Sequence, residues 1–501
     1  MPSTAKHAPR NLSVVLSAIL LFGGCASMLQ RPVSHTMPPP EDFGKSFSVQ
    51  ELKSDLTMLM ETLEAVHPNL YAYASKSDID SVRSAIEQSL KVPMTRLEFY
   101  FAIAPLLVRI GDGHTSVSPP WEEFSHFRLQ EGGLAFPFTV AFDTLMGVTI
   151  TRNYSGDSLL AIGDRILSIN GCSMDSLFAS FLSGFSGERK IFRQQNVAGS
   201  LRLLLWLKNI RAPFDIVVRR RSDQGLIARR TGGVTLEDVL KTDSLAGRRN
   251  TSLPAYRYER LRDSIGYIDF RSMSDLERFE TFLTATFTDV RAHPIRGLIV
   301  DLRSNGGGNS QLGSALLSFL TDSSYRMCER KEWKMSAQYK DYMRGMIPWW
   351  IRWFPFTWVS SEARRYFAAA DGDIVIDTSF VERPPDNPLR YHGKTCFLIG
   401  TGTFSSAMML SNAVADFKLA TLIGEETGGI PTAYGEVYPF DLPNTRLAVG
   451  VSSAFFVRAN GNRTDRRGIM PDIEVCTTES DIRAKKDTVL ERAIEWIRSG
   501  T

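Results

Sequence analysis

Apolar residues recur at helical spacing in the first part of the chain. They return every three or four positions over residues 52–66, again over 78–90 and again over 96–110. This is the period of a helix with one buried face. We therefore predict a small helical domain over residues 48–120.

The pattern changes to short apolar runs separated by turns over residues 130–222. The run 163–169 is followed by Asn170-Gly171, a pair that favours a tight β-hairpin. A long stretch with helical spacing, residues 194–209, interrupts the strands. We predict a small β module with helix inserted into it.

Residues 255–480 alternate apolar strands with helices, the longest helix being expected at 276–292. Near-continuous apolar strands separated by helices are typical of a sheet covered on both faces. The fold class predicted for this region is therefore α/β. Residues 481–501 are expected to contain a closing amphipathic helix. The predicted strands cover residues 264–270, 297–302, 395–399, 420–423 and 447–451.

An insertion at residues 331–370 is rich in tryptophan, with arginines interleaved. We expect a peripheral subdomain that packs its own aromatic rings. A lid or a membrane-facing surface is the alternative, because Trp and Arg suit an interface. The tryptophans are Trp333, Trp349, Trp350, Trp353 and Trp358.

The N-terminal residues have the pattern of an export signal. Lys6 and Arg10 precede a short apolar run, and two glycines then lead to Cys25. A basic start, a short apolar core and small residues before the cut are the parts of such a signal. The ending resembles a bacterial lipoprotein signal over residues 1–24, with Cys25 as the lipidated residue and 25–47 as an extended tether. An ordinary secretory signal or an uncleaved anchor is the alternative.

Composition narrows the class of protein. The chain is 43% hydrophobic and 23% charged, with a net charge of +3, which is ordinary for a soluble globular body. No long basic block appears, so no nucleic-acid partner is expected. Beyond Cys25 the four remaining cysteines lack metal-binding spacing, so we predict no metal site, and any disulfide pairing is left open.

Ser405 is the candidate nucleophile. It follows the apolar run 395–399 and opens a helical pattern over 408–417. A serine at such a turn is exposed, and the helix start offers free N–H groups, here that of Ser406, to a developing negative charge. A simple helix N-cap is the competing interpretation of the same serine.

Three consecutive glycines, Gly306 to Gly308, follow the apolar strand 297–302. Glycines let a backbone approach a ligand and point its amides at it. The motifs of phosphate-binding loops are absent. We therefore predict an oxyanion hole that uses the amide of Gly307.

His114 is the candidate general base. Serine needs a base to take its proton, and histidine is the natural one near neutral pH. Of the seven histidines, His114 is the one that lies in a Gly-x-Gly context, at the end of the predicted helical domain.

Taken together, these pieces resemble the C-terminal-processing and tricorn-core serine peptidases. The resemblance implies a ClpP/crotonase-like catalytic core, an N-terminal helical cap and a PDZ-like module at 130–222. It covers the chain from about residue 50 to 476. The stretches that carry it are Asp112-Gly113-His114-Thr115, the G-D-x-I-L-x-I-N-G run at 163–171, Asp301 to Gly307, Thr403 to Ala407, Gly424 to Gly429 and Gly468 to Ile473.

The family has two catalytic designs, and this chain resembles the tricorn-like one. The position of the lysine in the Ser/Lys design is held by Ile430. The other design uses the histidine of the cap-to-core motif and a carboxylate just before the G-[VI]-x-P-D motif. That carboxylate's place is held by Asp465, and Glu436 is the reserve.

The resemblance implies a serine endopeptidase that needs no cofactor. Its partners are expected to be polypeptide substrates and, through the lipid on Cys25, a membrane, at the outer membrane of the cell envelope. The alternatives are a catalytically silent ligand-binding lipoprotein on the same core and a peptide-binding scaffold that uses the PDZ-like module. The oligomeric state is left open.

Overall fold

The computed structural model describes residues 38–143, 146–245, 254–347, 361–478, 481, 484 and 486–499. The predicted signal at 1–24, Cys25 and most of the tether lie outside the described residues. Four of the five tryptophans of the insertion lie outside them as well. Among the described residues, no helix is long and apolar enough to cross a membrane.

The N-terminal helical region contains helices where the apolar spacing predicts them. Each of the first three helices begins with a capping box, in which a Ser or Thr and an acidic residue three positions later bind each other's backbone amides. Each of these helices therefore has a start signal in its own local sequence that does not depend on tertiary packing. The elements are η1 (Pro40–Asp42), β1 (Ser46–Phe47), α3 (Val49–Val66), α4 (Lys76–Ser89), β2 (Met94–Thr95), α5 (Arg96–Ile110), β3 (Ser116–Val117) and α6 (Trp121–Leu129).

The second region is built on an antiparallel sheet of order β4-β5-β6-β8-β9, with β7 paired to β6. The hairpin predicted at Asn170-Gly171 is confirmed, and both residues have positive φ. The sheet extends beyond residue 222, and the predicted inserted helix is two helices that meet at Ser200. The elements are β4 (Phe138–Asp143), β5 (Gly147–Asn153), β6 (Arg165–Ile169), β7 (Cys172–Ser173), α7 (Met174–Leu182), α8 (Lys190–Gly199), α9 (Leu201–Leu207), β8 (Phe214–Arg219), β9 (Leu226–Thr231) and α10 (Leu236–Leu245).

The α/β fold is confirmed by a six-stranded sheet of order β10-β11-β12-β15-β16-β19. Its strands are parallel except β10. Separate apolar clusters cover its two faces, which is why its central strands are continuously hydrophobic. The elements are β10 (Tyr256–Leu261), η2 (Arg262–Ser264), β11 (Ile265–Phe270), α11 (Leu276–Ala292), β12 (Gly297–Asp301), α12 (Gln311–Ser318), β15 (Thr395–Ile399), α17 (Ser405–Asp416), β16 (Thr421–Gly424), β19 (Ile473–Glu474) and α19 (Thr488–Arg498).

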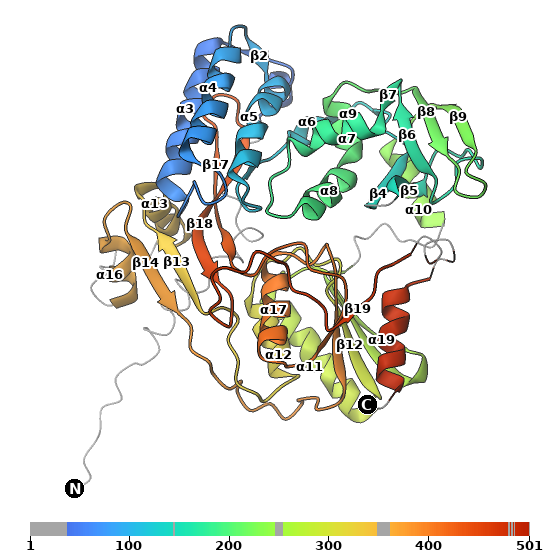
Figure 1. Ribbon diagram of the computed structural model, residues 1–501, viewed down its shortest axis with the longest axis vertical. Helices are drawn as coiled ribbons and strands as arrows, with labels where there is room; N and C mark the ends of the chain where they lie inside the picture. The colour runs from blue at the N-terminus through green and yellow to red at the C-terminus, as the bar shows by residue number, and fades with distance from the viewer. Residues whose placement is uncertain are drawn as a thin grey trace.

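A second sheet of order β14-β13-β18-β17 joins this core to the helical region (Figure 1). The short β3 pairs with β18, so strand pairing joins the chain that leaves the helical region to the core. At the β17–β18 turn, the fully buried Asp55 of α3 accepts hydrogen bonds from Asn444 and Thr445. The elements are β13 (Arg330–Lys334), α13 (Ala337–Met346), α16 (Ser361–Ala368), β14 (Ile374–Thr378), β17 (Ala433–Asp441) and β18 (Ala448–Val457).

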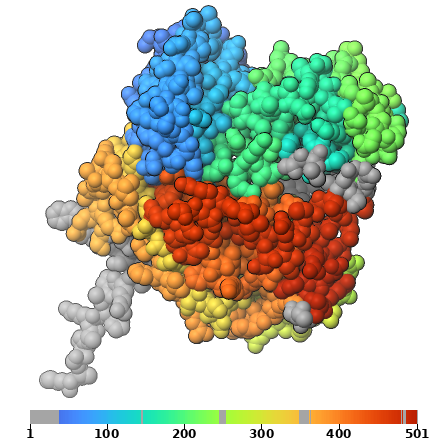
Figure 2. All heavy atoms as spheres, in the orientation of Figure 1, coloured from blue at the N-terminus to red at the C-terminus, as the bar shows by residue number. Residues whose placement is uncertain are grey.

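The described part of the predicted insertion packs its own aromatic rings. Trp333 is buried, stacks on Tyr339 and donates its indole N–H to Asp377 at 3.1 Å. Lys334 donates to the carbonyl of Glu64, at the end of α3, at 2.6 Å. In the space-filling view the helical region and the β module both rest on the C-terminal part of the core (Figure 2).

Candidate active site

Ser405 lies at the carboxyl edge of the parallel sheet. The chain leaves β15 at Ile399, turns, and begins α17 at Ser405. Ser405 is half-buried and has φ = 50°, a left-handed conformation that a non-glycine residue adopts only under constraint. The neighbouring parallel strand β12 leads into the glycine loop. Because β12 and β15 pair directly, their two loops meet at the same edge.

Hydrogen bonds hold these two loops together. Thr403 donates its hydroxyl to the carbonyl of Leu302 at 2.8 Å, and the amide of Phe404 donates to the carbonyl of Asn305 at 3.0 Å. The hydroxyl of Ser406 donates to the carbonyl of Gly308 at 2.6 Å. The position of the serine relative to the glycines is therefore set by the fold.

The two predicted oxyanion donors lie side by side. Ser406 is the second residue of α17, where an amide has no acceptor within the helix. Gly307 has φ = 101° and packs directly against Ser405 and Ser406. The amide of Gly307 donates to the side-chain oxygen of Asn305 at 2.9 Å. An oxyanion would have to share or displace that contact.

Replacing Gly307 by alanine is expected to damage this site. A Cβ there would lie 2.7 Å from the Cβ of Ser405 and 2.8 Å from the amide nitrogen of Ser406, in a backbone conformation that disfavours side chains. If the displaced loop loses one oxyanion donor, kcat falls by about 10²–10³. The matched control is Gly306→Ala, because a Cβ at Gly306 meets nothing within 4 Å. Steady-state kinetics of both variants checks the prediction, and equal activities would contradict it.

His114 reaches Ser405 from 291 positions earlier in the chain. Its Nε2 lies 3.1 Å from the Oγ of Ser405, a hydrogen-bonding distance. The imidazole stacks on Phe404 with ring centroids 4.8 Å apart. The pairing of β3 with β18, which starts two residues after His114, delivers the ring to this place.

A buried carboxylate holds the loop that carries His114. Asp112 is fully buried, and its Oδ1 accepts the backbone amide of His114 at 2.9 Å. Its Oδ2 accepts from the hydroxyls of Thr115 and Ser452, both at 2.5 Å, and faces Nε2 of His67 at 3.3 Å. Asp112 therefore ties the end of the helical region to β18.

The surroundings of His114 favour its neutral form. Burial lowers the pKa of the imidazole, while the charges of Asp112 and Glu436 and the backbone of Tyr434 act in the opposite direction. A lowered pKa leaves the ring unprotonated near neutral pH. It can then accept a proton from Ser405, as a general base must.

Asp465, the carboxylate expected at the third position, has other partners. Its Oδ2 accepts from Arg458 at 2.6 Å, and its Oδ1 accepts the backbone amide of Arg467 at 3.0 Å. The carboxylates whose charge acts on His114 are Asp112 and Glu436. The sequence could not reveal that Asp465 pairs with Arg458, because this pairing depends on how residues 458–465 fold.

The β module also reaches the site. Phe192 of α8 stacks on Phe404 with centroids 4.1 Å apart, so Phe404 is held between Phe192 and His114. Arg189 pairs with Glu426 at 2.8 Å. Sequence reasoning missed these contacts. A hydrophobic and a basic residue at the start of a helix carry no local signal of where that helix docks.

Within the described residues, no group of His, Cys, Asp or Glu is arranged to hold a metal ion. Cys172, Cys328, Cys396 and Cys476 are free thiols, and Cys328 and Cys396 are buried. Ile430, at the position of the alternative catalytic lysine, is buried as well.

Residues 264–475 match the model of peptidase family S41. An uncharacterized protein of Chlamydia muridarum (strain MoPn / Nigg) is 24% identical over an alignment of 259 residues that covers 46% of this chain and only 41% of that relative. The structure of mature CPAF complexed with lactacystin has a TM-score of 0.63 at 16% identity and covers 90% of this chain and 99% of its own. Mature CPAF alone gives a TM-score of 0.60 at 16% identity, with 90% and 96% covered. These two likenesses show a shared fold. The family resemblance predicted from the sequence is thus confirmed, and residues 264–475 of this chain are a domain of peptidase family S41.

Proposed function

We propose that this protein is a serine endopeptidase that hydrolyses peptide bonds through an acyl-enzyme, with Ser405 as nucleophile and His114 as general base. The observation that carries the proposal is the 3.1 Å distance between Ser405 Oγ and His114 Nε2, beside the glycine loop. The S41 family match supports the same reaction class.

In the first half of the reaction, the Oγ of Ser405 attacks the carbonyl carbon of the scissile peptide bond while His114 Nε2 takes its proton. The oxyanion of the tetrahedral intermediate is stabilised by the amide of Ser406 at the start of α17 and by the glycine loop at Gly307. His114 then gives the proton to the leaving amine, and the C–N bond breaks.

In the second half, water replaces the amine. His114 takes a proton from the water as it attacks the acyl carbon, and the proton returns to the Oγ of Ser405 when the ester bond breaks. The left-handed backbone of Ser405, at the first residue of α17, holds the hydroxyl beside Nε2 of His114. No step of this sequence requires an electron transfer.

We further propose that the substrates are exported polypeptides of the cell envelope. The support is the lipoprotein-like signal that ends at Cys25. Two or more acyl chains on that cysteine would hold the peptidase at a membrane surface. Metabolic labelling with a fatty-acid analogue, compared between the native chain and Cys25→Ala, tests the anchor. Equal labelling of the two would refute it.

A fluorophosphonate probe tests the nucleophile. Ser405 Oγ forms a bond to phosphorus, fluoride leaves, and His114 takes the hydroxyl proton. The expected result is one label per chain in the native protein and none in Ser405→Ala. A label that survives the substitution would reject Ser405, and the absence of labelling in the native protein would favour a binding function on the same fold.

A further inference from the structure

We infer that Glu436, held by Lys331, is the carboxylate that stabilises and orients His114 during the reaction. This assignment deepens the proposed function and rests on it. It places the carboxylate that positions His114 on β17 and not at Asp465.

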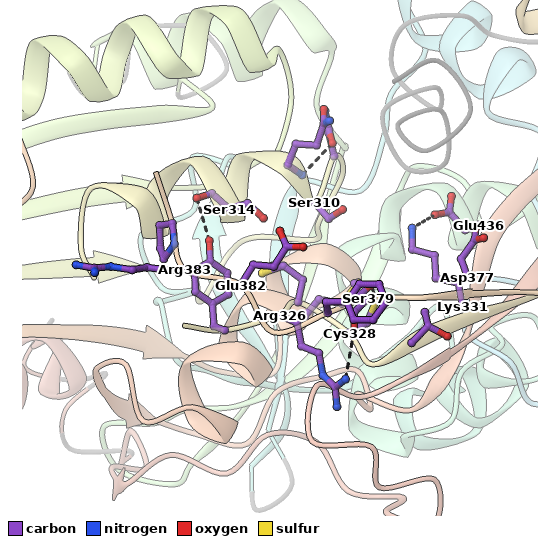
Figure 3. Close-up of a pocket in the computed structure, with 18 of the residues that line it drawn as sticks. Ser310, Ser314, Arg326, Cys328, Lys331, Asp377, Ser379, Glu382, Arg383 and Glu436 are labelled. Atoms are coloured by element: carbon purple, nitrogen blue, oxygen red, sulfur yellow. Dashed lines mark hydrogen bonds and ion pairs between the residues drawn. The ribbon is translucent and has the colours of Figure 1, made fainter. Parts of the chain in front are cut away.

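Glu436 is a buried carboxylate with unused hydrogen-bonding capacity. It is 4% exposed. One oxygen, Oε1, accepts from the Nζ of Lys331 at 3.0 Å (Figure 3). The other, Oε2, is buried and makes no hydrogen bond to any described residue. The Nδ1 of His114, on the ring edge away from Ser405, is likewise buried, and among the described residues it has no partner with full hydrogen-bond geometry, although the backbone of Tyr434 acts on the ring. A buried donor and a buried acceptor left unused are both costly.

The charge of Glu436 acts on His114, because it opposes the lowering of the imidazole pKa that burial causes. Val437, the neighbour of Glu436 on β17, pairs with Ser452, and Ser452 donates hydrogen bonds to Thr115 and Asp112 on the loop that carries His114. From this side, Oε2 is the group we assign to the Nδ1–H that His114 must carry while Nε2 accepts the proton of Ser405, either directly or through a bridging water. An anion at that nitrogen also stabilises the imidazolium that forms in the transition state.

Asp112 is not free to take this role. Its Oδ1 lies 4.0 Å from His114 Nδ1, beyond a hydrogen bond, and is used by the backbone amide of His114. Its Oδ2 faces three further donors, on His67, Thr115 and Ser452. Turning Asp112 toward Nδ1 would leave buried donors unpaired, whereas Oε2 of Glu436 has no hydrogen bond among the described residues to give up.

The backbone at Glu436 is shaped for this placement. Glu436 has φ = 54°, and the β17–β18 ladder is interrupted there, with Gly435 paired to Ala454 and Val437 to Ser452. The hydroxyl of Ser453 donates to the carbonyl of Glu436 at 2.6 Å in place of the ladder contact. Left-handed non-glycine residues are strained and concentrate at functional sites. Ser405 and Glu436 are two of the ten described non-glycine residues with positive φ.

Glu436 and Lys331 also line a cavity of about 560 Å³ (Figure 3). Small solutes can therefore reach the pair. If the carboxylate of Glu436 is removed, the ammonium of Lys331 remains to attract a small anion into the same place. This makes the inference open to chemical rescue.

The first experiment compares Glu436→Gln with a matched control, Glu332→Gln. Glu332 lies on β13, in the same sheet as Glu436, but its carboxylate pairs with Arg463 near the surface. We expect Glu436→Gln to lower kcat by at least about 10²-fold with KM changed only a few-fold, because a base without its carboxylate loses transition-state stabilisation. Glu332→Gln is expected to keep the native kcat. Asp465→Asn is measured beside them, and a larger loss there than in Glu436→Gln would overturn the assignment.

The second measurement is the pKa of His114 by NMR titration, with its signal assigned from His114→Ala and read in a Ser405→Ala background. Removing a nearby negative charge lowers a histidine pKa, so Glu436→Gln should move the titration of His114 to lower pH. This readout needs no hydrolysis. A native chain that hydrolyses nothing refutes the proposed function, whereas an unmoved His114 titration refutes the role of Glu436.

Other groups near His114 also bear on this titration. Burial and the charge of Asp112 raise the pKa of Glu188 to about 8, above the pH range in which His114, with its lowered pKa, titrates. The charged groups that act on the ring are Asp112 and Glu436. His67 and Glu188 interact with Asp112, and Lys331 binds Glu436.

The third measurement adds formate to Glu436→Ala. We expect formate to raise the kcat of Glu436→Ala at least tenfold in a saturable manner. A tenfold rise corresponds to about 1.4 kcal/mol of transition-state stabilisation. It should do much less in Glu436→Ala/Lys331→Met, which lacks the ammonium. A loss of activity without rescue and without a change in the His114 titration would mean that Glu436 is merely structural, and would overturn the inference.

Discussion

Replacement of His114 by alanine is expected to lower kcat/KM for a peptide substrate by about 10⁴-fold or more. The physical reason is that Ser405 then has no base within reach of its Oγ, which now lies 3.1 Å from Nε2 of the ring. Folding should persist, because the side chain of His114 is 17% exposed and its Nδ1 has no partner with full hydrogen-bond geometry among the described residues. Steady-state kinetics with a fluorogenic peptide and a thermal melt of the same preparation check both parts.

The matched control is His126→Ala, which removes another partly exposed histidine, one that lies on α6 and pairs with Glu131. It should leave kcat/KM unchanged. The double variant Ser405→Ala/His114→Ala should be no less active than Ser405→Ala alone, because residues that act as a unit are not additive. If His114→Ala kept a tenth or more of native activity, another base would have to be sought.

Replacement of Asp112 by alanine is expected to lower the free energy of unfolding by about 3 kcal/mol or more. The fully buried carboxylate accepts from Thr115, Ser452 and the His114 amide, and all of these donors would be left unpaired. Urea denaturation measures the change. The control is Asp175→Ala, whose side chain is 82% exposed and should cost within about 0.5 kcal/mol.

The same carboxylate gives a pH dependence of known sign. Burial alone would raise the pKa of Asp112, but the hydrogen bond and charge of His67, the charge of His114 and the Ser452 hydroxyl bring it well below its usual value. A carboxyl group whose folded pKa is lowered stabilises the protein above its unfolded pKa of about 3.9, and this stabilisation is lost as pH falls through the folded value. The difference in stability between the native chain and Asp112→Asn should therefore shrink below about pH 4. A difference that grows with acid would contradict this account.

Local sequence signals predicted the framework of the molecule. Capping boxes and regular apolar spacing predicted α3, α4 and α5, and Asn170-Gly171 predicted its hairpin, because these features act over a few neighbouring residues. The strands β13 and β17 were not predicted. Their sequences mix polar and apolar residues, and they become strands only by pairing with β18.

The sequence by itself determined the chemical parts of the site: a serine at a strand-to-helix turn, a histidine in a glycine context and a glycine loop. Each of these is marked by its immediate neighbours along the chain. Only the tertiary structure brings Ser405 and His114 together and gives each carboxylate its surroundings, since these depend on the pairing of β3 with β18, on the left-handed backbone of Glu436 and on the ion pair between Asp465 and Arg458. Charges act through space, and the distances that decide between them exist only once the strands are paired.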